Sequence, residues 1–404
     1  MRPRHPVHVL GAGPGGLAAA AALGAHGIRA VVVEKSDAVG ASWRAHYDRL
    51  RLHTTRRWSS LPGLPIPRAA GRWVRRDDFV AYLEDYARHH RIDLATGVEV
   101  GRIDRDPDGA AGPHDPDRGW LLRANGGRVL RASAVVVATG YNHTPRMPDW
   151  PGAEDFTGEL LHARHYREPS RFAGRDVLVV GAGNTGAEIA ADLAFGGAGR
   201  VRLAVRSVPH ILRRSTLGWP AQAGAILCRR LPTGLVDRAA RPLERLLPDL
   251  SDKGLPRPET GLYTRVRQGA IPVLDTGRTG LVRAVKRGLV EPVAAVASFD
   301  GDEVVLADGA RLRPDAVIAA TGYRRGLEPL VGHLGLLDGR GLPLVHGAQT
   351  HPAAPGLYFT GYANPISGML RELSRDAVKI ANAVARRLGS SRPLSSQRAR
   401  GRAG

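Results

Sequence analysis

The stretch DVLVVGAGNTGAEIAADLAFGGAGRVRLAVR, residues 176–206, decides the fold of this chain. An apolar β-branched run at residues 177–180 is followed by Gly181, Gly183 and Gly186 in G-x-G-x-x-G spacing, then by a helical segment and a second apolar strand. This spacing allows a tight turn, a close backbone approach to a pyrophosphate and close packing of helix on strand. The phosphates then lie at the helix N-terminus, where unpaired N–H groups favour anions. The stretch therefore predicts a βαβ dinucleotide-binding unit.

A second unit of the same kind stands at the N-terminus. Residues 7–10 read as a strand, GAGPGG follows at residues 11–16, and after a helical segment residues 30–33 form a strand that ends at Glu34. An acid at this strand end accepts hydrogen bonds from an adenosine ribose. The chain is therefore expected to hold two dinucleotides.

The two units differ at the end of their second strand. The first has Glu34 there, and the second has Arg206. A guanidinium suits a 2′-phosphate through a bidentate contact, whereas an acid would repel it. We therefore predict FAD at the first unit and NADPH at the second. The alternative for Arg206 is that it is one surface arginine among many.

Length and cysteine content narrow the class of protein. The chain has 404 residues, 43% of them hydrophobic, which suits two or three globular domains. Cys228 is the single cysteine, so an intramolecular disulfide framework and a CxxC redox centre are both excluded. No signal peptide and no run of about 20 apolar residues is visible. We expect a cytoplasmic protein without a transmembrane segment.

The net charge of +20 permits two interpretations. It could serve nucleic-acid or membrane binding, or reflect a compositional preference for arginine. We favour the second and expect no nucleic-acid partner, because the arginines are spread along the chain without an aromatic reading surface. The histidines show no metal-ligand spacing, so no metal is predicted. Residues 391–404 read as a disordered, arginine-rich tail.

Several segments outside the two units bear on the site. Residues 40–67 are rich in Arg, Trp, Tyr and His, and either bind a ligand or pack on the domain. Residues 208–269, with helices expected at 221–230 and 234–247, either cover the active site, which we favour, or touch a membrane surface as a peripheral contact. The strand at 134–138 enters Thr139-Gly140, and the strand at 316–320 enters Thr321-Gly322, so the plan is duplicated. The remaining expected elements are a helix at 77–90, meanders at 98–132 and 289–312, a strand at 356–360 entering Gly361, and a helix at 375–388.

FTGELLHARHY, residues 156–166, lies between GAGPGG and GAGNTG and fits F-x-G-x-x-x-H-x-x-x-(F/Y/W). With this signature the chain resembles the single-component flavin-dependent monooxygenases over about residues 5–388. Within that family it is most similar to the plant YUCCA enzymes and their bacterial relatives. The segments that carry this likeness are SWRAHYDRLRLH at 42–53, LPGLPIP at 61–67, IPVLDTG at 271–277 and DAVIAATGYR at 315–324.

Two departures point away from other members of the family. Amine- and sulfide-oxidising members have an Asn near the flavin where this chain has Thr54 and Thr55. Baeyer–Villiger members usually end the signature in Trp, and this chain ends it in Tyr166.

The resemblance implies a set of site residues. Trp43, Arg44 and His53 are candidate neighbours of the flavin, and no side chain is assigned a catalytic role because the cofactor carries the chemistry. The signature residues Phe156, Gly158, His162 and Tyr166 are expected to couple the domains; from the residues alone, a packed loop or a chemical role is open. The residues expected at the cofactors are Gly11, Gly13, Gly15, Gly16, Glu34, Lys35, Trp43, His53, Thr139, Gly140, Gly181, Gly183, Asn184, Thr185, Gly186, Arg206, Thr321, Gly322 and Gly361.

The fold expected from these observations is α/β, with two Rossmann-like, doubly wound, three-layer domains. The FAD domain is expected at residues 1–155 and 316–390, with an NADPH domain at 156–315 inserted into it.

The resemblance implies that NADPH reduces the flavin and that oxygen forms a C4a-hydroperoxide shielded by NADP+. One oxygen atom then enters a small organic substrate. An arylpyruvate-type 2-oxo acid, decarboxylated oxidatively, is the candidate substrate. The alternatives are N- or S-oxygenation, Baeyer–Villiger oxidation of a ketone, and an NADPH oxidase or flavin reductase that makes peroxide.

Overall fold

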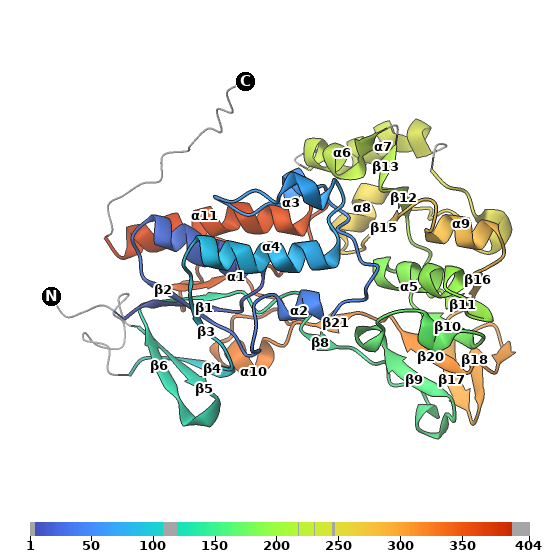
Figure 1. Ribbon diagram of the computed structural model, residues 1–404, viewed down its shortest axis with the longest axis horizontal. Coiled ribbons are helices and arrows are strands. Elements are labelled where there is room, and N and C mark those ends of the chain that lie inside the picture. Colours follow the sequence, from blue (N-terminus) through green and yellow to red (C-terminus); the bar gives the residue numbers. More distant parts are fainter. Residues whose placement is uncertain (1–4, 108–118, 217, 230, 245–246, 390–404) are drawn as a thin grey trace.

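The computed structural model describes residues 5–107, 119–216, 218–229, 231–244 and 247–389. Figure 1 shows two lobes side by side, one built mainly from the blue, cyan and red parts of the chain together with the orange helix α10, and the other from the green and yellow parts and the remaining orange part. Each lobe is organised around one five-stranded sheet. The predicted arginine-rich tail, residues 391–404, lies outside the described residues.

The sheet of the first lobe has the order β22-β7-β1-β2-β3, and all its strands are parallel. Its strands are short and rich in valine, which suits a parallel sheet covered on both faces. β1 and β7 are buried throughout. The strands are β1 (Val7–Leu10), β2 (Ala30–Val33), β3 (Asp93–Ala95), β7 (Ala134–Val137) and β22 (Leu357–Phe359).

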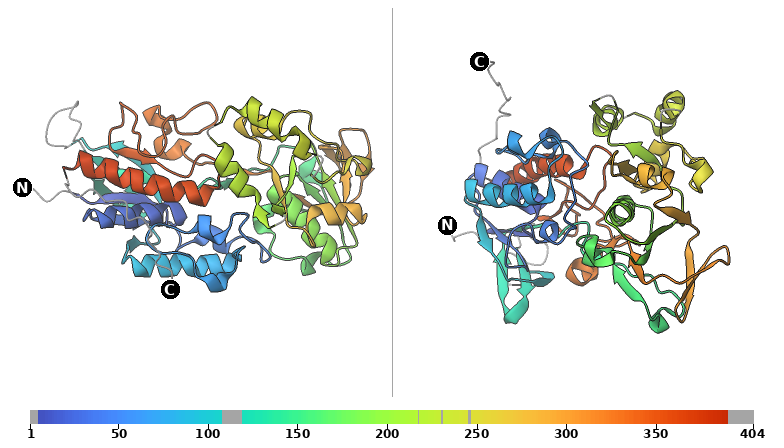
Figure 2. Two further views of the ribbon diagram at one scale, coloured as in Figure 1. Left: turned by 90° about the horizontal axis from the view of Figure 1, so that it is seen from above. Right: turned by 45° about the vertical axis from the view of Figure 1, so that its right-hand side comes forward.

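Three helices cover one face of this sheet, and a meander covers the other. Seen from above, the helices α1 (Pro14–Ala25), α4 (Arg76–His89) and α11 (Met369–Arg387) run beside one another (Figure 2). The opposite face packs against Trp120 and Ile103 of the antiparallel meander and against α10 (Glu328–Val331). The meander strands are β4 (Val100–Arg105), β5 (Trp120–Ala124) and β6 (Val129–Ala132).

The sheet of the second lobe repeats this plan with the order β16-β11-β10-β20-β9, again all parallel. The helices α5 (Asn184–Phe195) and α9 (Leu281–Lys286) cover one face, and a second meander packs on the other through Phe299 and Val304. The sheet strands are β9 (Glu159–His162), β10 (Asp176–Val180), β11 (Arg200–Ala204), β16 (Glu291–Val293) and β20 (Ala316–Ala319). The meander strands are β17 (Val296–Asp300), β18 (Glu303–Leu306) and β19 (Arg311–Leu312).

The chain passes between the lobes through a paired crossing. β8 (Thr144–Pro145) and β21 (Tyr323–Arg324) follow the two repeated Thr-Gly turns and form an antiparallel pair. The segment after β2 also reaches the second lobe, and it contains the short helices α2 (Ala41–Arg44) and α3 (Arg56–Ser59). Short 3-10 helices lie at Arg68–Ala70, Asn125–Gly127, Ala153–Asp155, Ala163–His165, Ser170–Phe172, Ser251–Lys253 and Gly332–Leu334.

An insertion between β11 and β16 forms the upper part of the second lobe (Figure 1). It holds the two predicted helices, now α6 (Ala221–Cys228) and α7 (Thr233–Glu244). Trp219, Leu227 and Leu235 are exposed on this insertion, while Gln222 is buried. The other elements of the insertion are β12 (Ile211–Arg213), β13 (Ser215–Thr216), β14 (Trp219–Pro220), α8 (Leu262–Arg267) and β15 (Val273–Asp275).

The α/β class with two dinucleotide-type domains is confirmed, and three details differ from expectation. The strand at 316–319 lies in the second sheet, because it pairs with β10 and β9, so the expected boundary at residue 316 falls one strand too early. Residues 291–293 join the second parallel sheet rather than the meander, because they pair with β11. The last helix begins at Met369, six residues before the expected start, where its face meets α1.

The glycines of the second unit have separable roles that a pair of variants tests. A Cβ at Gly186 would lie 1.8 Å from the Gly181 carbonyl oxygen, whereas one at Gly183 would meet nothing within 4 Å. Gly186→Ala is expected to lower the free energy of unfolding by about 3 kcal/mol or more, since backbone must shift. Gly183→Ala should leave the stability of the ligand-free protein unchanged. Urea unfolding measures both, and equal stability of the two variants would contradict this assignment.

Candidate functional site

The first glycine turn forms a cradle before α1. A Cβ at Gly11 would lie 2.6 Å from the Ala138 carbonyl oxygen, and one at Gly16 would lie 1.9 Å from the Gly11 carbonyl oxygen. Gly13, at the N-cap, has open space instead, and no acidic residue or side-chain cap occupies the first turn. The helix N-terminus is therefore open to a phosphate group. This geometry fits a dinucleotide pyrophosphate.

Glu34 is held at the rim of this cradle. Its carboxylate accepts hydrogen bonds from the backbone N–H groups of Ala12, at 2.7 Å, and Ser36, at 2.9 Å. These contacts fix the side chain beside the glycine turn, with acceptor capacity left for a ribose hydroxyl. Lys35 points elsewhere, since its Nζ lies 3.5 Å from His143 Nε2 on an exposed surface.

The second glycine turn repeats the first before α5. A Cβ at Gly181 would lie 2.7 Å from the Ala320 carbonyl oxygen, while Gly183 is open. Asn184 does not face the open space with its amide. It donates to the Pro272 carbonyl at 3.0 Å and accepts from the Leu274 N–H at 2.8 Å. Its side chain therefore ties α5 to β15, which leaves backbone N–H groups, including that of Thr185, as the groups that could bind a phosphate here.

Arg206 lies exposed just beyond β11. Within the described part of the chain its guanidinium has no ion pair or hydrogen bond. A groove next to it is lined largely by apolar and proline side chains: Val208, Pro209, His210, Ile211, Leu247, Pro248, Leu250, Leu255, Pro256, Arg257 and Pro258. A cation beside an apolar groove fits an adenosine that carries a phosphate.

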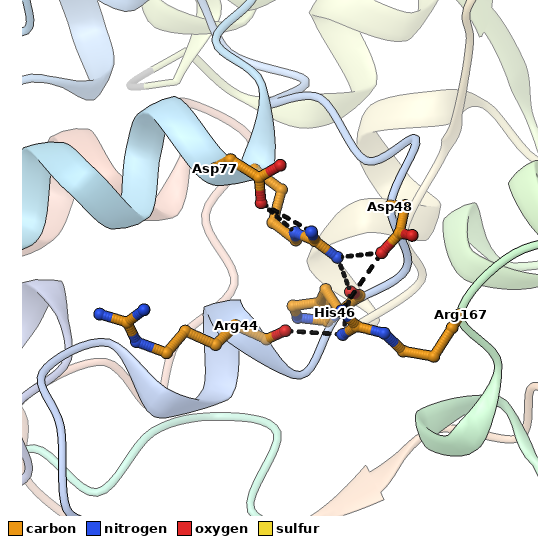
Figure 3. A network of polar contacts seen from close by, with 6 residues as sticks. Arg44, His46, Asp48, Asp77 and Arg167 are labelled. Carbon is orange, nitrogen blue, oxygen red and sulfur yellow. Dashed lines mark hydrogen bonds and ion pairs between the residues drawn. The ribbon is translucent and has the colours of Figure 1, made fainter.

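The segment after α2 is anchored to the first lobe by Arg76, the first residue of α4 (Figure 3). Its guanidinium donates to Asp77 at 2.7 Å, to the His46 carbonyl at 2.6 Å, and to the Asp48 carboxylate. Arg76 is buried, so these partners replace the water that its charge loses. The segment therefore has a fixed backbone at residues 46–48.

The same segment is anchored from the second lobe by Arg167. This side chain donates to the carbonyl groups of Arg44, at 2.6 Å, and His46, at 2.8 Å, and forms an ion pair with Asp48 at 3.2 Å (Figure 3). The Asp48 N–H also donates to the Arg167 carbonyl at 2.9 Å. Residues 44–48 thus bind both lobes at once.

Two carboxylates one turn apart on α5, Glu188 and Asp192, receive the side chains of this segment. The hydroxyl of Tyr47 donates to Glu188 at 2.6 Å, and His53 Nε2 lies 3.4 Å from the other Glu188 oxygen. Arg49 pairs with Asp192 at 3.1 Å. Glu188 is buried, so these contacts satisfy a charge that burial would otherwise penalise.

Burial sets the protonation of the groups around Glu188. Burial lowers the pKa of His53 although the Glu188 carboxylate opposes this, so the ring is neutral at pH 7. Burial, with Glu188 adding to it, raises the pKa of Tyr47 well above its usual value, so its hydroxyl stays a donor. His53 Nδ1 is buried and has no hydrogen-bond partner among the described residues. A polar atom of this kind is available to a bound cofactor or substrate.

Gln222 of α6 brings three segments together nearby. Its side chain donates to the Ser367 carbonyl at 2.7 Å and accepts from the Thr55 N–H at 3.3 Å. A Cβ at Gly368 would lie 2.5 Å from Gln222 and 2.8 Å from Thr54. The insertion therefore reaches the first lobe beside His53, as expected of a cover over the site.

The signature residues couple elements of the second lobe and the crossing. His162 Nδ1 accepts from the Arg164 N–H, so Nε2 carries the proton and donates to the Gly322 carbonyl at 3.1 Å. The hydroxyl of Tyr166 donates to Asp192 at 2.8 Å. Phe156 packs edge-on against Phe299, with a ring separation of 5.1 Å. These contacts lie within the second lobe and the crossing, so a role of the signature in coupling the domains stays a prediction.

Gly158 and the turns that end the sheet strands have steric or hydrogen-bonding reasons for their residue type. A Cβ at Gly158 would lie 2.5 Å from the Phe156 ring. Thr139 shares a 2.7 Å hydrogen bond with the Tyr362 hydroxyl, and the Gly361 N–H donates to His346 Nε2 at 3.2 Å. Gly140, Gly322 and Gly361 have φ of 96°, 83° and 87°, where glycine is favoured.

Trp43 and Arg44 face the first lobe rather than His53. The Trp43 ring packs edge-on against Phe79 of α4, with centroids 4.5 Å apart, and the Arg44 guanidinium pairs with Glu84. Of the three candidate flavin neighbours, His53 alone belongs to the group around Glu188.

Two other residues predicted at the cofactors contact neighbouring elements. Thr321 donates to the Arg146 carbonyl in the crossing. Gly15 lies against Leu373 of α11.

Sequence reasoning missed Tyr47, Glu188 and Gln222. One signal was present for Glu188, because an acid within the apolar helix 184–195 needs a partner. Tyr47 lies in the quoted stretch 42–53, but nothing local marks its partner. Gln222 lies in the insertion, whose pattern resembles neither unit.

Comparison with known proteins agrees with this architecture. Residues 8–211 match the family described as pyridine nucleotide-disulphide oxidoreductase. The indole-3-pyruvate monooxygenase YUCCA1 of Oryza sativa subsp. japonica is 37% identical over 93% of this chain and 90% of its own length. The probable indole-3-pyruvate monooxygenase YUCCA1 of Arabidopsis thaliana is 33% identical over 94% and 89%.

Solved structures show the same fold. The flavin-containing monooxygenase from Stenotrophomonas maltophilia superposes with a TM-score of 0.72 and 26% identity, over 95% of this chain and 98% of that chain. Cyclohexanone monooxygenase in an open crystal form superposes with a TM-score of 0.66 at 19% identity, over 95% and 88%, which shows shared fold alone.

Two facing dinucleotide cradles and a shared interlobe segment define a flavoprotein oxidoreductase that uses a pyridine nucleotide. The chain belongs to the flavin-containing monooxygenase family, in its YUCCA-like group. It is a flavin-dependent monooxygenase that uses oxygen and a small-molecule substrate. In the described residues, no helix combines the length and apolar character that crossing a bilayer requires.

His46 makes the anchored segment sensitive to acid. Burial lowers its pKa to about 4, and Arg76 and Arg167 add repulsion. As the pH falls below about 6.5, the unfolded chain takes up this proton and the folded chain does not. Folding therefore loses about 2 kcal/mol through this group between pH 7.5 and pH 5. His46→Gln should lose correspondingly less stability over that range, measured by urea unfolding at both pH values. Parallel losses in the variant and the wild type would contradict the assignment.

Proposed function

We propose that this monooxygenase uses FAD and NADPH to decarboxylate an arylpyruvate-type 2-oxo acid oxidatively. The observation that carries the proposal is the likeness to the rice indole-3-pyruvate monooxygenase, which is 37% identical and extends over 93% of this chain. A likeness over both lobes includes both cradles and the interlobe segment, which are the parts that contact cofactors and substrate in this proposal.

The first lobe would hold FAD and the second NADPH. Support for the first comes from the open N-cap at Gly13 and from Glu34, whose carboxylate is suited to a ribose. Support for the second comes from the open N-cap at Gly183 and from the unpaired guanidinium of Arg206, which is suited to a 2′-phosphate. The boundaries between the two domains are placed near residues 140 and 320, where the chain forms the paired crossing.

The flavin supplies the chemistry of hydride acceptance and oxygen activation when it is bound. The chain supplies position and a dry surrounding. Tyr47 and His53, held by Glu188, hold the first lobe's segment against α5, and Gln222 closes the insertion onto Thr55 and Ser367. Excluding water in this way strengthens electrostatic contacts in the site and suppresses side reactions.

The overall reaction balances as arylpyruvate, O₂, NADPH and a proton giving arylacetate, CO₂, water and NADP+. One oxygen atom enters the new carboxylate and the other leaves as water. The carbon–carbon bond between the carbonyl and carboxylate groups breaks. NADPH supplies two of the four electrons that reduce O₂, and oxidation of the substrate supplies the other two. The chain needs no metal ion for this balance.

Turnover with arylpyruvates tests the proposal directly. The FAD-loaded protein, mixed with NADPH and indole-3-pyruvate or phenylpyruvate in air, is expected to release arylacetate and CO₂ in near-equal amounts to the NADPH consumed. Product is measured by chromatography with catalase present, which destroys released peroxide before it can decarboxylate the 2-oxo acid. Peroxide is measured by a coupled assay in a parallel run without catalase, with a thioether and a cyclic ketone as comparison substrates. If peroxide accounts for all NADPH with every substrate, the protein is an oxidase. If only the thioether or ketone is oxygenated, the substrate class is wrong.

The role of Arg206 is tested through nucleotide preference. Arg206→Ala should raise the KM for NADPH about 10- to 100-fold and leave that for NADH unchanged, because a charge-assisted contact to the 2′-phosphate is lost. Arg283→Ala removes the same charge from an exposed position on α9 and is the matched control. An unchanged preference for NADPH in Arg206→Ala would refute the assignment.

A further inference from the structure

Arg214 carries a half-buried charge between the lobes. Its Nη1 atom is buried and has no hydrogen-bond partner, and within the described residues its guanidinium forms no ion pair. Burial lowers the pKa of Arg214, yet an arginine side chain stays charged at any pH the protein meets. A half-buried cation without an ion pair has lost part of its hydration without replacement, so the site favours an anion as its partner.

The backbone holds Arg214 in place from two sides. The residue follows β12 directly, where its N–H donates to the Asp275 carbonyl at 3.1 Å. Its own carbonyl accepts from the Ala221 N–H at the start of α6, at 3.1 Å. The direction of the side chain is therefore set by the insertion, which reaches toward the first lobe.

The guanidinium lies against the first lobe. Its central carbon is 4.3 Å from the centre of the Trp73 ring, at cation–π distance. Trp73 belongs to the strand-like stretch beside His53, since the Leu52 N–H donates to the Val74 carbonyl at 2.8 Å. The neighbouring stretch of the first lobe is fixed to the insertion by Arg72, which donates to the Gly218 carbonyl at 2.6 Å. Arg214 therefore lies at the interlobe surface, near the group around Glu188.

The acids near Arg214 are already used. Glu188 attracts it, but the two oxygens of that carboxylate are occupied by Tyr47 and His53. Asp275 accepts from backbone N–H groups of residues 277 and 282. Arg51 faces Arg214 and repels it. Both carboxylates thus have other hydrogen-bond partners, and among the described residues the N–H groups of Arg214 remain available, next to the unpartnered Nδ1 of His53.

We propose that Arg214 binds the carboxylate of the substrate, with Trp73 holding its guanidinium flat. A planar guanidinium matches a carboxylate through two parallel N–H···O bonds, which orients as well as binds it. This inference rests on the proposed function. It defines the substrate class further as organic acids that bind with the carboxylate group directed toward the insertion. Arg214 is in this account a specificity-determining residue.

The test uses binding by the FAD-loaded protein, so that it does not depend on turnover. Calorimetry measures the Kd of 3-phenylpropanoate, an unreactive analogue of an arylpyruvate, and of its uncharged amide. The wild type should bind the acid at least about 10-fold more tightly than the amide. Arg214→Gln should weaken the acid about 10- to 100-fold and leave the amide unchanged, with Arg214→Lys between the two. Arg213→Gln, at the neighbouring exposed arginine, is the control.

Three results would overturn the inference. The first is equal affinity of the wild type for acid and amide, a measurement that does not depend on whether any variant folds. The second is an unchanged Kd for the acid in Arg214→Gln. The third is a loss of NADP+ affinity in Arg214→Gln that matches the loss for the acid, which would make the residue a nucleotide ligand. If instead the acid binds through Arg214 and the wild type forms no arylacetate, the inference holds and the proposed reaction fails.

Discussion

The Glu188 carboxylate on α5 is the contact on which the arrangement of the two lobes depends. It is buried in the second lobe, and its partners Tyr47 and His53 come from the first. A buried carboxylate without partners would cost several kcal/mol, so separation of the lobes either exposes Glu188 or leaves it unsatisfied. The pairing therefore specifies one relative placement. Asp192, one turn further along α5, extends the contact through Arg49 of the first lobe, and Tyr166 of the second lobe donates to its other oxygen.

The duplicated plan explains why the site lies between the lobes. In each lobe a glycine turn follows one strand of the sheet and leads into a helix whose N-terminus is open. Each lobe can therefore hold the phosphates of one nucleotide. What distinguishes the lobes are the side chains at the strand ends, Glu34 and Arg206, and the elements inserted after them. The 40–67 segment of the first lobe meets the 208–269 insertion of the second at Gln222, and Arg214 of the insertion contacts Trp73 just beyond that segment. In the proposed reaction, the reacting groups would be enclosed by parts that neither lobe could provide alone.

The sequence predicted local features well and the long-range contacts poorly. The strands before and after each glycine turn were predicted within one residue, because sterics at the glycines and buried valine runs act over short distances. The placement of residues 316–319 and 291–293 was wrong, since pairing in a parallel sheet depends on strands far apart in the chain. Tyr47 and Glu188 are separated by 141 positions, and no local pattern marks such a pair. Trp43 packs on Phe79, and its predicted place beside the flavin stays a prediction, because an aromatic side chain fits a core as readily as a ligand site.

The central claim is that the enclosed interlobe site directs activated oxygen into the substrate rather than into peroxide. Isotope incorporation tests it most directly. When turnover with an arylpyruvate is run under ¹⁸O₂ in unlabelled water with catalase present, arylacetate should still form, and mass spectrometry should show one ¹⁸O atom per molecule. Catalase is needed because released peroxide would carry the same label into the arylacetate. Loss of arylacetate on addition of catalase, with NADPH still consumed, would show that decarboxylation occurs outside the site through released peroxide and would contradict the account.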